Sequence, residues 1–197
     1  GSGVTSIGNN VFFYCTSLTS IDIPNSVTSI GNSAFYQCRG LTSANINGGS
    51  IGSGAFRDCT SLSSVTIDDG VTSIGNYAFY RCSGLTSIDI PSGVTSIGSY
   101  AFSGCSSLTS CTIGSGVTTI GDSAFYGCTG LTSIEIPDSV TSICSSAFTR
   151  CSGLTSITIE STTPPTLGTS AFTNTNACQI YVPCESVETY LNASDWN

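Results

Sequence analysis

The chain has 197 residues, of which 39% are hydrophobic and only 8% are charged, and its formal net charge is −8. Its four basic residues are all arginines, so it lacks the cationic surface that nucleic acid or an acidic membrane requires. No segment approaches the ~20 consecutive apolar residues of a membrane-spanning helix, and we expect no membrane insertion within this chain. The apolar residues recur periodically and can therefore bury one another, which excludes the disordered class.

The chain repeats one pattern, V-T-S-I-G-x-x-A-F-x-x-C-x-x-L-T-S-I-x-I-P, seven times with a period of 23 residues. Each copy carries a phenylalanine, at Phe12, Phe35, Phe56, Phe79, Phe102, Phe125 and Phe148. A cysteine follows three residues later, at Cys15, Cys38, Cys59, Cys82, Cys105, Cys128 and Cys151. Such a period predicts a repeat solenoid, in which each coil buries its apolar face against its neighbours. We assign 1–160 to seven repeats, and 161–197 to a degenerate last repeat and a C-terminal cap.

The chain opens inside a repeat, because residues 1–5 match residues 114–118. Nothing that resembles a cap precedes the first copy, so we expect further repeats or an export signal ahead of it in a longer protein. We also expect this uncapped coil to leave Val4, Ile7 and Phe12 partly exposed. Its unpaired strand edges would allow end-to-end self-association.

The fourth copy shows the predicted path of one coil. Residues 71–74 form an extended stretch on one wall, and Gly75 then permits a turn with positive φ. Residues 78–79 are expected as a short helical turn whose phenylalanine fills the core. Residues 85–90 form a short parallel strand on the concave wall, with Leu and Ile directed inward and Ser and Asp outward. Stacked coils rise by ~4.8 Å each, the spacing between neighbouring strands.

Two copies depart from the pattern. The third is two residues short, with residues 47–51 replacing the usual P-x-x-V-T-S-I, so we expect one wall to be pinched there. In the seventh copy Cys144 stands at the glycine position, which costs ~1 kcal/mol if that site keeps positive φ.

The last segment departs from the repeat. Residues 163–165 predict a bend, and Ile180 and Val182 predict a final strand because they lie one period after the preceding one. Residues 185–191 have apolar side chains at helical spacing and acidic residues near their start, which predicts a short helix. Together with Trp196, this helix is expected to cover the open end of the core.

The repeat I-G-x-x-A-F-x-x-C-x-x-L-T-S-I-x-I-P resembles that of the BspA-like, or treponemal-type, leucine-rich repeat proteins. The tail from Tyr181-Val182-Pro183 through Tyr190 and Trp196 resembles the terminal segment of many members. The resemblance implies a leucine-rich repeat solenoid that is secreted or attached to the cell surface of an anaerobic or host-associated microbe. It also implies an adhesin that binds host matrix proteins or other cells, with no cofactor and no shared catalytic residue.

The eleven cysteines first suggest a metal or redox site, but the ladder cysteines are 20 or more residues apart and no C-x-x-C pair or histidine accompanies them. Zinc sites are usually built from close ligand pairs, so we expect no metal. We interpret the ladder and Cys111 as buried thiols that act as small hydrophobic residues. Cys178 and Cys184 flank the last strand, and the sequence leaves open whether they form a disulfide.

The concave wall offers the first candidate binding surface. Its outward serines do not vary, whereas the next outward position does: Asp22, Asn45, Thr66, Asp89, Thr112, Glu135 and Thr158. Asp89 and Glu135 lie two coils apart, ~10 Å, near the upper limit for the carboxylates of an inverting glycosidase. An open Ser/Thr surface supplies no walls to exclude water, so we interpret the row as a solvated face or a weak polar binding surface.

Aromatic residues around the A-F turn form a second candidate. Tyr77 and Tyr80 lie three residues apart, and Tyr100 stands one coil after Tyr77. Exposed aromatic side chains can anchor protein or sugar partners. The alternative is that they only cover the turn edge of the solenoid.

The sequence therefore favours a non-catalytic extracellular or cell-surface module that binds a protein or glycan on host or microbial surfaces. The alternative function is a structural spacer or assembly module that projects or links other domains, which the near-uniform Ser/Thr surface supports. An enzyme is not expected. The chain has no histidine or lysine, and most acid–base and nucleophilic catalytic sites need one of them.

Overall fold

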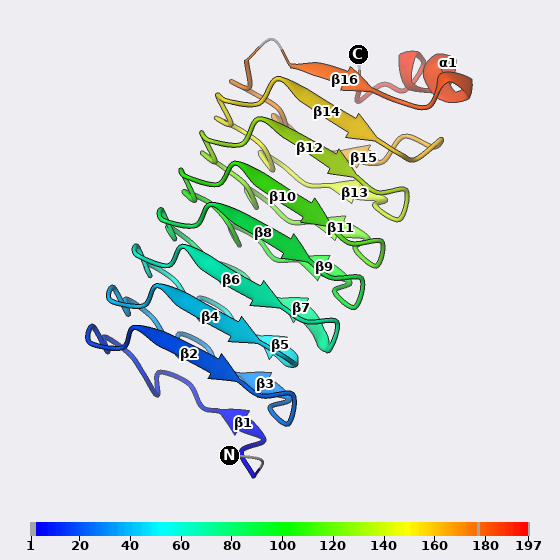
Figure 1. Ribbon diagram of the computed structural model, residues 1–197. Coiled ribbons are helices and arrows are strands. Elements are labelled where there is room, and N and C mark those ends of the chain that lie inside the picture. Colours follow the sequence, from blue (N-terminus) through cyan, green and yellow to red (C-terminus); the bar gives the residue numbers. More distant parts are fainter. Residues whose placement is uncertain (1–2, 177, 197) are drawn as a thin grey trace.

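The computed structural model describes residues 3–176 and 178–196. The chain winds into a solenoid of stacked coils with parallel strands on two walls and one short helix at the C-terminal end (Figure 1). This confirms the repeat solenoid and the two strand walls that the period predicted. No helix among the described residues has the length and apolar character that a membrane crossing requires.

The wide wall, which the sequence predicted as the concave one, is built from the L-T-S-I-x-I segments. Its strands are β2 (Ser20–Ile23), β4 (Ser43–Ile46), β6 (Ser64–Ile67), β8 (Ser87–Ile90), β10 (Ser110–Ile113), β12 (Ser133–Ile136), β14 (Ser156–Ile159) and β16 (Gln179–Tyr181). They pair in parallel within three groups, β2–β4–β6, β8–β10 and β12–β14–β16.

The narrow wall is a single eight-stranded parallel sheet built from the V-T-S-I segments. Its strands, in order, are β1 (Ser6–Ile7), β3 (Ser29–Ile30), β5 (Gly49–Ile51), β7 (Val71–Ile74), β9 (Ser96–Ile97), β11 (Thr119–Ile120), β13 (Ser142–Ile143) and β15 (Thr166–Leu167). Equivalent residues of successive copies pair with each other, as Ser6 does with Ser29 and Ile7 with Ile30. One period therefore corresponds to one coil.

The centre of the solenoid is a column of phenylalanine rings, which we call the phenylalanine spine. It consists of Phe12, Phe35, Phe56, Phe79, Phe102, Phe125, Phe148 and Phe172. Successive ring centroids lie between 4.9 and 5.6 Å apart. The planes are within 14° of parallel, so each ring is offset from its neighbour while remaining in contact. The six middle rings are fully buried.

The A-F segment is not the short helical turn that the sequence predicted. In the fourth copy it forms successive tight turns, with Ala78 N–H donating to Gly75 O at 3.2 Å and Cys82 N–H to Phe79 O at 3.1 Å. Phe79 N–H donates outside its own coil, to Ala101 O at 2.8 Å. The carbonyl groups of each coil thus accept hydrogen bonds from backbone amides of the preceding coil, whereas a helix would have directed those amides along its own axis.

The glycine before each A-F turn is needed for a reason that the sequence analysis did not predict. Positive φ occurs two residues later, at Tyr77 (59°), and again at Arg81 (55°), and not at Gly75. A Cβ atom on Gly75 would lie 2.8 Å from Ile51 O of the preceding coil, so this position is glycine because the two backbones approach closely. Cys144 does not have positive φ either, and the conformational cost expected there does not arise.

The threonines of the repeat hold neighbouring coils together. Thr118 Oγ1 donates to Thr95 O at 3.2 Å on the narrow-wall side, and Thr109 Oγ1 donates to Thr86 O at 3.0 Å on the wide-wall side. Most other copies repeat one or both of these bonds. The repeated threonines are therefore structural, whereas the serines beside them on the wide wall make no such contact between coils.

The short third copy pinches the narrow wall, as predicted. The register between β5 and β7 shifts between Gly49 and Ser50, where the two missing residues are absorbed. Gly49 has φ of 82°, and a Cβ atom there would lie 2.5 Å from the carbonyl carbon of Thr28. The deletion therefore requires glycine at this point.

The C-terminal segment contains the predicted last strand and helix. β16 pairs in parallel with β14, and the 3-10 turn η1 (Cys184–Ser186) leads into α1 (Val187–Leu191). Tyr190 is buried and its hydroxyl donates to Ser161 O at 2.9 Å.

Trp196 completes this end of the molecule. Its ring lies 6.1 Å from that of Phe172, the last member of the spine, and its Nε1–H donates to Pro165 O at 2.9 Å. Val187 and Leu191 of this expected cap line an exposed apolar groove of about 350 Å³. The helix is too short to bury more than one side chain per turn, and Tyr190 occupies that position.

We expect Phe102→Ala to lower the free energy of unfolding by about 3–5 kcal/mol, because it removes a fully buried ring and the stacking of its two neighbours. Urea denaturation followed by circular dichroism measures the loss. Phe13→Ala, at a ring that is 43% exposed, is the matched control and should cost clearly less. Equal losses for the two variants would contradict a central role for the spine.

Candidate functional site

The wide wall presents a row of exposed side chains that take no part in the core. The parallel register aligns Asp22 with Asn45 and Asn45 with Thr66, all three exposed. In the same way Asp89 faces Thr112, and Glu135 faces Thr158 on the next coil. The structure therefore places all seven predicted positions in one row on one surface (Figure 1).

At the N-terminal part of this row the polar groups bond to one another. Asn47 Nδ2 donates to Asp22 Oδ1 at 3.2 Å, and Thr66 Oγ1 donates to Asn45 Oδ1 at 2.9 Å. These two bonds fix the orientation of Asp22 and Asn45 across neighbouring coils. The free carboxylates of the row therefore lie further along, on the later coils.

The later coils contain a hollow that the sequence did not predict, which we call the acidic hollow. It encloses about 200 Å³ and is lined by Cys111, Thr112, Ile113, Glu135, Pro137 and Glu160. A hydrogen bond with Glu135 raises the pKa of Glu160, with smaller contributions from burial and from the negative charges of Glu135 and Asp138. Two carboxyl groups from neighbouring coils thus lie in contact beside the hollow, which gathers acidic groups at this part of the surface.

The pairing of carboxylates differs from the one that the sequence suggested. Glu135 lies beside Glu160, whereas Asp89 is two coils away on β8. Carboxyl groups in hydrogen-bond contact are closer than the roughly 5 Å of a retaining glycosidase pair, so this pair does not fit that chemistry. Glu160 could have been noticed in the sequence, because it stands where three other copies carry proline after the last strand isoleucine.

The three predicted aromatic residues do lie together. Tyr77 and Tyr100 stack at 5.0 Å with planes 4° apart, and Tyr80 meets Tyr77 edge-on at 5.6 Å. Sequence reasoning missed Arg57, whose guanidinium lies 5.6 Å from the Tyr77 ring and 5.0 Å from the Tyr80 ring. The signal was present, because Arg57 occupies in the third copy the column that holds Tyr80 in the fourth.

The cysteine ladder is part of the core. Six of its seven cysteines are fully buried and Cys15 is half-buried. Each buried thiol donates to the carbonyl of a spine phenylalanine, as Cys82 Sγ does to Phe56 O at 3.1 Å and Cys105 Sγ to Phe79 O at 3.2 Å. Burial raises the pKa of Cys105 to about 12, so the thiol form persists at neutral pH.

The two tail cysteines differ from the ladder. Cys178 is half-buried against the core and Cys184 is exposed, and both are free thiols in this structure. The bridge between them remains a prediction. Across residues 3–176 and 178–196, no group of three His, Cys, Asp or Glu side chains is arranged to hold a metal ion.

A solenoid with two walls of short parallel strands, a stacked apolar core and an open polar face defines a leucine-rich repeat protein. The family model described as BspA type Leucine rich repeat region (6 copies) matches residues 1–85 and 72–194. The chain therefore belongs to the BspA-type leucine-rich repeat family. No curated protein sequence matches it.

Solved structures of bacterial leucine-rich repeat proteins share the fold. The T. pallidum Leucine Rich Repeat protein is 25% identical with a TM-score of 0.76, over 92% of this chain and 81% of its own. A leucine rich cell surface protein from Faecalibacterium prausnitzii is 29% identical with a TM-score of 0.60, over 91% and 65%. A Bacteroides ovatus leucine-rich repeat protein, 24% identical with a TM-score of 0.52 over 85% and 61%, is similar in fold. This chain spans less than two thirds of the last two proteins.

We expect the buried ladder thiols to resist modification in the folded protein, because their sulfur atoms are shielded from the reagent. With an aromatic disulfide reagent, Cys184 should react rapidly and the ladder only after denaturation. Cys184→Ser should remove the fast phase.

A bridge between Cys178 and Cys184 can be tested by titrating the thiols under denaturing conditions without reductant. If the two residues are bridged, the titration detects two fewer thiols than the eleven of the sequence.

The Glu135–Glu160 pair makes stability depend on pH. Since the folded-state pKa of Glu160 is raised, the folded protein binds this proton more readily than the unfolded chain does. The free energy of unfolding should therefore increase as the pH falls from neutral through that raised pKa. The change should stay below about 1 kcal/mol, because the pair is exposed to solvent.

Glu160→Gln should remove this contribution, whereas Glu188→Gln on the exposed face of α1 makes the same charge change and should preserve it. Urea denaturation over a series of pH values measures both variants. A pH profile of Glu160→Gln that is identical to the wild-type profile would contradict the assignment.

Proposed function

We propose that this chain is a non-catalytic, adhesin-like binding module of a cell-surface or secreted protein, and that its wide wall carries the ligand. The observation that carries the proposal is that most repeated residues have a structural role, whereas most outward positions of the wide wall do not. Phenylalanine, cysteine, leucine and isoleucine fill the core, and threonine joins the coils. The serines of the wide wall make no such bonds. The variable position beside them bonds between coils at Asp22, Asn45 and Thr66, whereas the later coils keep side chains that are free to contact a partner.

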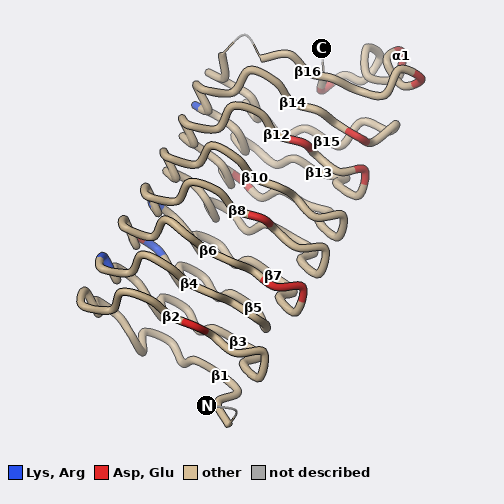
Figure 2. The backbone as a smooth tube through the Cα atoms, in the orientation of Figure 1, with Lys and Arg blue, Asp and Glu red and all other residues tan. Residues whose placement is uncertain are grey.

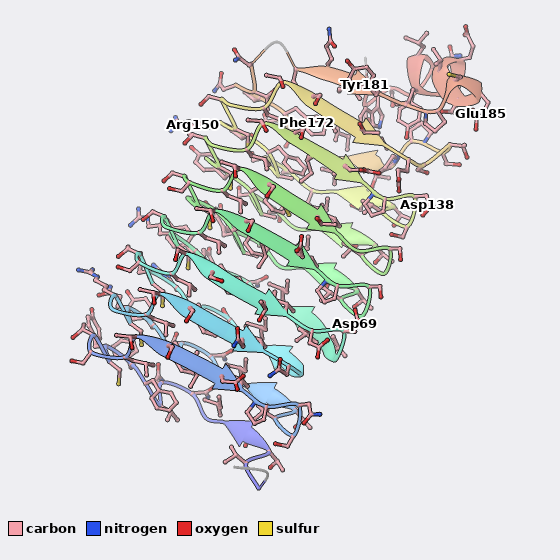
Figure 3. The ribbon with its side chains drawn as sticks, in the orientation of Figure 1. Asp69, Asp138, Arg150, Phe172, Tyr181 and Glu185 are labelled. Atoms are coloured by element: carbon pink, nitrogen blue, oxygen red, sulfur yellow. The ribbon has the colours of Figure 1, made fainter. Side chains whose placement is uncertain are left out.

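The charge of this surface indicates the chemistry of the ligand. Seven of the twelve acidic residues lie on the wide wall or on the loops that follow its strands, whereas the arginines lie at the opposite edge (Figure 2). Figure 3 shows the same separation, with Asp69 and Asp138 on one side of the coils and Arg150 on the other. The acidic hollow adds a concave site for a positively charged side chain. A protein ligand with a basic patch, or a cationic glycan, on a host or microbial surface is complementary to this face.

Family membership supports an extracellular or surface location. The Faecalibacterium prausnitzii protein with the same fold is described as a cell surface protein. BspA-type repeats in bacterial surface proteins are suited to protein interaction, because stacked coils present a long surface at a fixed spacing. For this chain we assign the protein interaction to the acidic hollow and to the row of variable positions on the wide wall.

A spacer or assembly module is the second candidate. The observation that favours it is the exposure of apolar side chains on the first coil, including Val4 (48%), Val11 (56%) and Phe13 (43%). Exposed strand edges and apolar side chains promote end-to-end association. Concentration-dependent elongation that Val11→Ser abolishes would support this function in place of ligand binding.

The binding function is tested by neutralising the later part of the wall with Asp89→Asn, Glu135→Gln and Glu160→Gln in one protein. A control with Glu185→Gln, Glu188→Gln and Asp195→Asn removes the same number of charges from the exposed tail. Both are compared with wild type by biolayer interferometry against matrix proteins, mucins and glycans. We expect the wall variant to lose about tenfold or more in affinity for the bound ligand, and the control less than about twofold.

Equal losses of affinity in the two variants would show that binding depends only on net charge. The wide wall would then not be the binding site. Circular dichroism and thermal unfolding of each variant establish that a loss of binding does not reflect a loss of fold.

A further inference from the structure

Three of the four arginines gather on three successive coils at the A-F turn edge, away from the wide wall. They are Arg39 on the second coil, Arg57 on the third and Arg81 on the fourth, and Figure 2 shows them along the edge opposite the carboxylates. Tyr36 and Tyr80 lie among them. We call these five residues the tyrosine–arginine edge.

Arg57 is held between two aromatic rings. Its guanidinium lies 5.6 Å from the centroid of the Tyr36 ring and 5.0 Å from that of the Tyr80 ring, on the coils before and after its own. The Tyr77 ring contacts it as well, at 5.6 Å. Stacking of this kind restricts the rotation of a long side chain, so the guanidinium is already ordered before any ligand arrives.

The neighbouring arginines are connected to the same cluster. Arg81 lies 5.1 Å from the Tyr80 ring. Arg39 Nη2 donates to Gln37 Oε1 at 3.2 Å, and Gln37 Nε2 donates to the Tyr36 hydroxyl at 2.9 Å. The edge is therefore one connected set of donors and not three independent side chains.

The positive charge of this edge is only partly neutralised by the carboxylates of the described residues. Among the described residues one ion pair is present, between Arg57 Nε and Asp58 Oδ2 at 3.5 Å. Arg39 and Arg81 are exposed and have no carboxylate within ion-pair distance in that part of the chain, and 40% of the Arg57 side chain is also exposed. A chain with a net charge of −8 thus keeps a local excess of positive charge at one place.

The stacking also shows which ligands do not fit. The Tyr36 ring has Phe13 stacked at 4.9 Å as well as Arg57, and the Tyr80 ring has Arg57 and Arg81. Tyr77 is covered by Tyr100 and Arg57. Since these faces are occupied, a sugar ring cannot stack on them, and the edge offers a partner mainly the N–H groups of its arginines.

We propose that the tyrosine–arginine edge is a second binding site, which takes an extended acidic segment of a protein partner. Tyrosine and arginine are among the residues most enriched at the energetic centres of protein interfaces, and arginine binds carboxylates through paired hydrogen bonds. The three coils span roughly 10 Å along the solenoid axis, which an extended peptide covers with about three residues. Two or three Asp or Glu side chains of such a segment can therefore meet the three arginines together.

The test uses the full chain and a fluorescently labelled oligoglutamate peptide, with binding followed by fluorescence anisotropy. Arg57→Gln should weaken binding by about tenfold or more, because a charge-assisted hydrogen bond in an ordered site is lost. Arg150→Gln is the matched control. Arg150 lies on the same edge over the Tyr126 ring at 5.5 Å, so the variant removes the same charge and the same type of stacking outside the cluster. Its effect should be less than about twofold.

Thermal unfolding of Arg57→Gln shows whether the coils remain intact. If this variant unfolds, Arg39→Gln combined with Arg81→Gln tests the same site through two exposed side chains, and we again expect a loss of about tenfold or more. Arg57→Lys keeps the charge but not the planar donor pair, and it should not restore wild-type affinity.

Several outcomes would overturn the proposal. These are no binding of oligoglutamate by wild type, equal losses with Arg57→Gln and Arg150→Gln, or binding of a heparin oligosaccharide that depends on Arg57 while oligoglutamate does not bind. The variant with Asp89→Asn, Glu135→Gln and Glu160→Gln should bind oligoglutamate as well as wild type does. A failure at the wide wall and a failure at the tyrosine–arginine edge can therefore be told apart.

Discussion

The spacing between hydrogen-bonded parallel strands, about 4.8 Å, is the constraint on which this molecule depends. Every coil must advance by that distance, and the side chains inside must then fit one another at the same repeat. The phenylalanine spine meets this requirement, with ring centroids 4.9 to 5.6 Å apart and planes nearly parallel. Backbone amides on both walls and at the A-F turns bond from coil to coil, so the spine and the ladders stabilise the same spacing.

This constraint explains why so little of the repeat is available for function. Each buried ladder cysteine donates to a phenylalanine carbonyl, glycines before the A-F turn such as Gly75 allow two backbones to approach, and the threonines join neighbouring coils. The residues that first suggest metal or redox chemistry are therefore structural. Binding is left to positions whose side chains leave the solenoid, and these lie on the wide wall and along the turn edge.

The two surfaces carry opposite charge, which follows from where the few charged residues fall within the repeat. Apart from Asp58 and Asp122, the acidic residues of the repeats occur at the variable position of the wide-wall strand and in the loop after it, whereas the arginines occur beside the A-F turn and the ladder cysteine (Figure 2). Since each position returns to the same edge on every coil, a bias in the sequence pattern becomes a charged edge in space. One solenoid can in this way offer separate sites to a basic ligand and to an acidic ligand.

The sequence by itself determined the solenoid, both walls, the buried phenylalanines and cysteines, the pinched third copy and the last strand. These features follow from contacts between residues one period apart, which can be read directly from a repeat. The tertiary structure alone decided the tight turns in place of a helix at Ala78-Phe79, the positive φ at Tyr77 instead of Gly75, the pairing of Glu135 with Glu160, and the position of Arg57 between Tyr36 and Tyr80. The period does not determine the two backbone features, because they depend on how the chain crosses from one wall to the other. It does not determine the two side-chain contacts either, because they depend on which residues meet where one copy departs from the pattern.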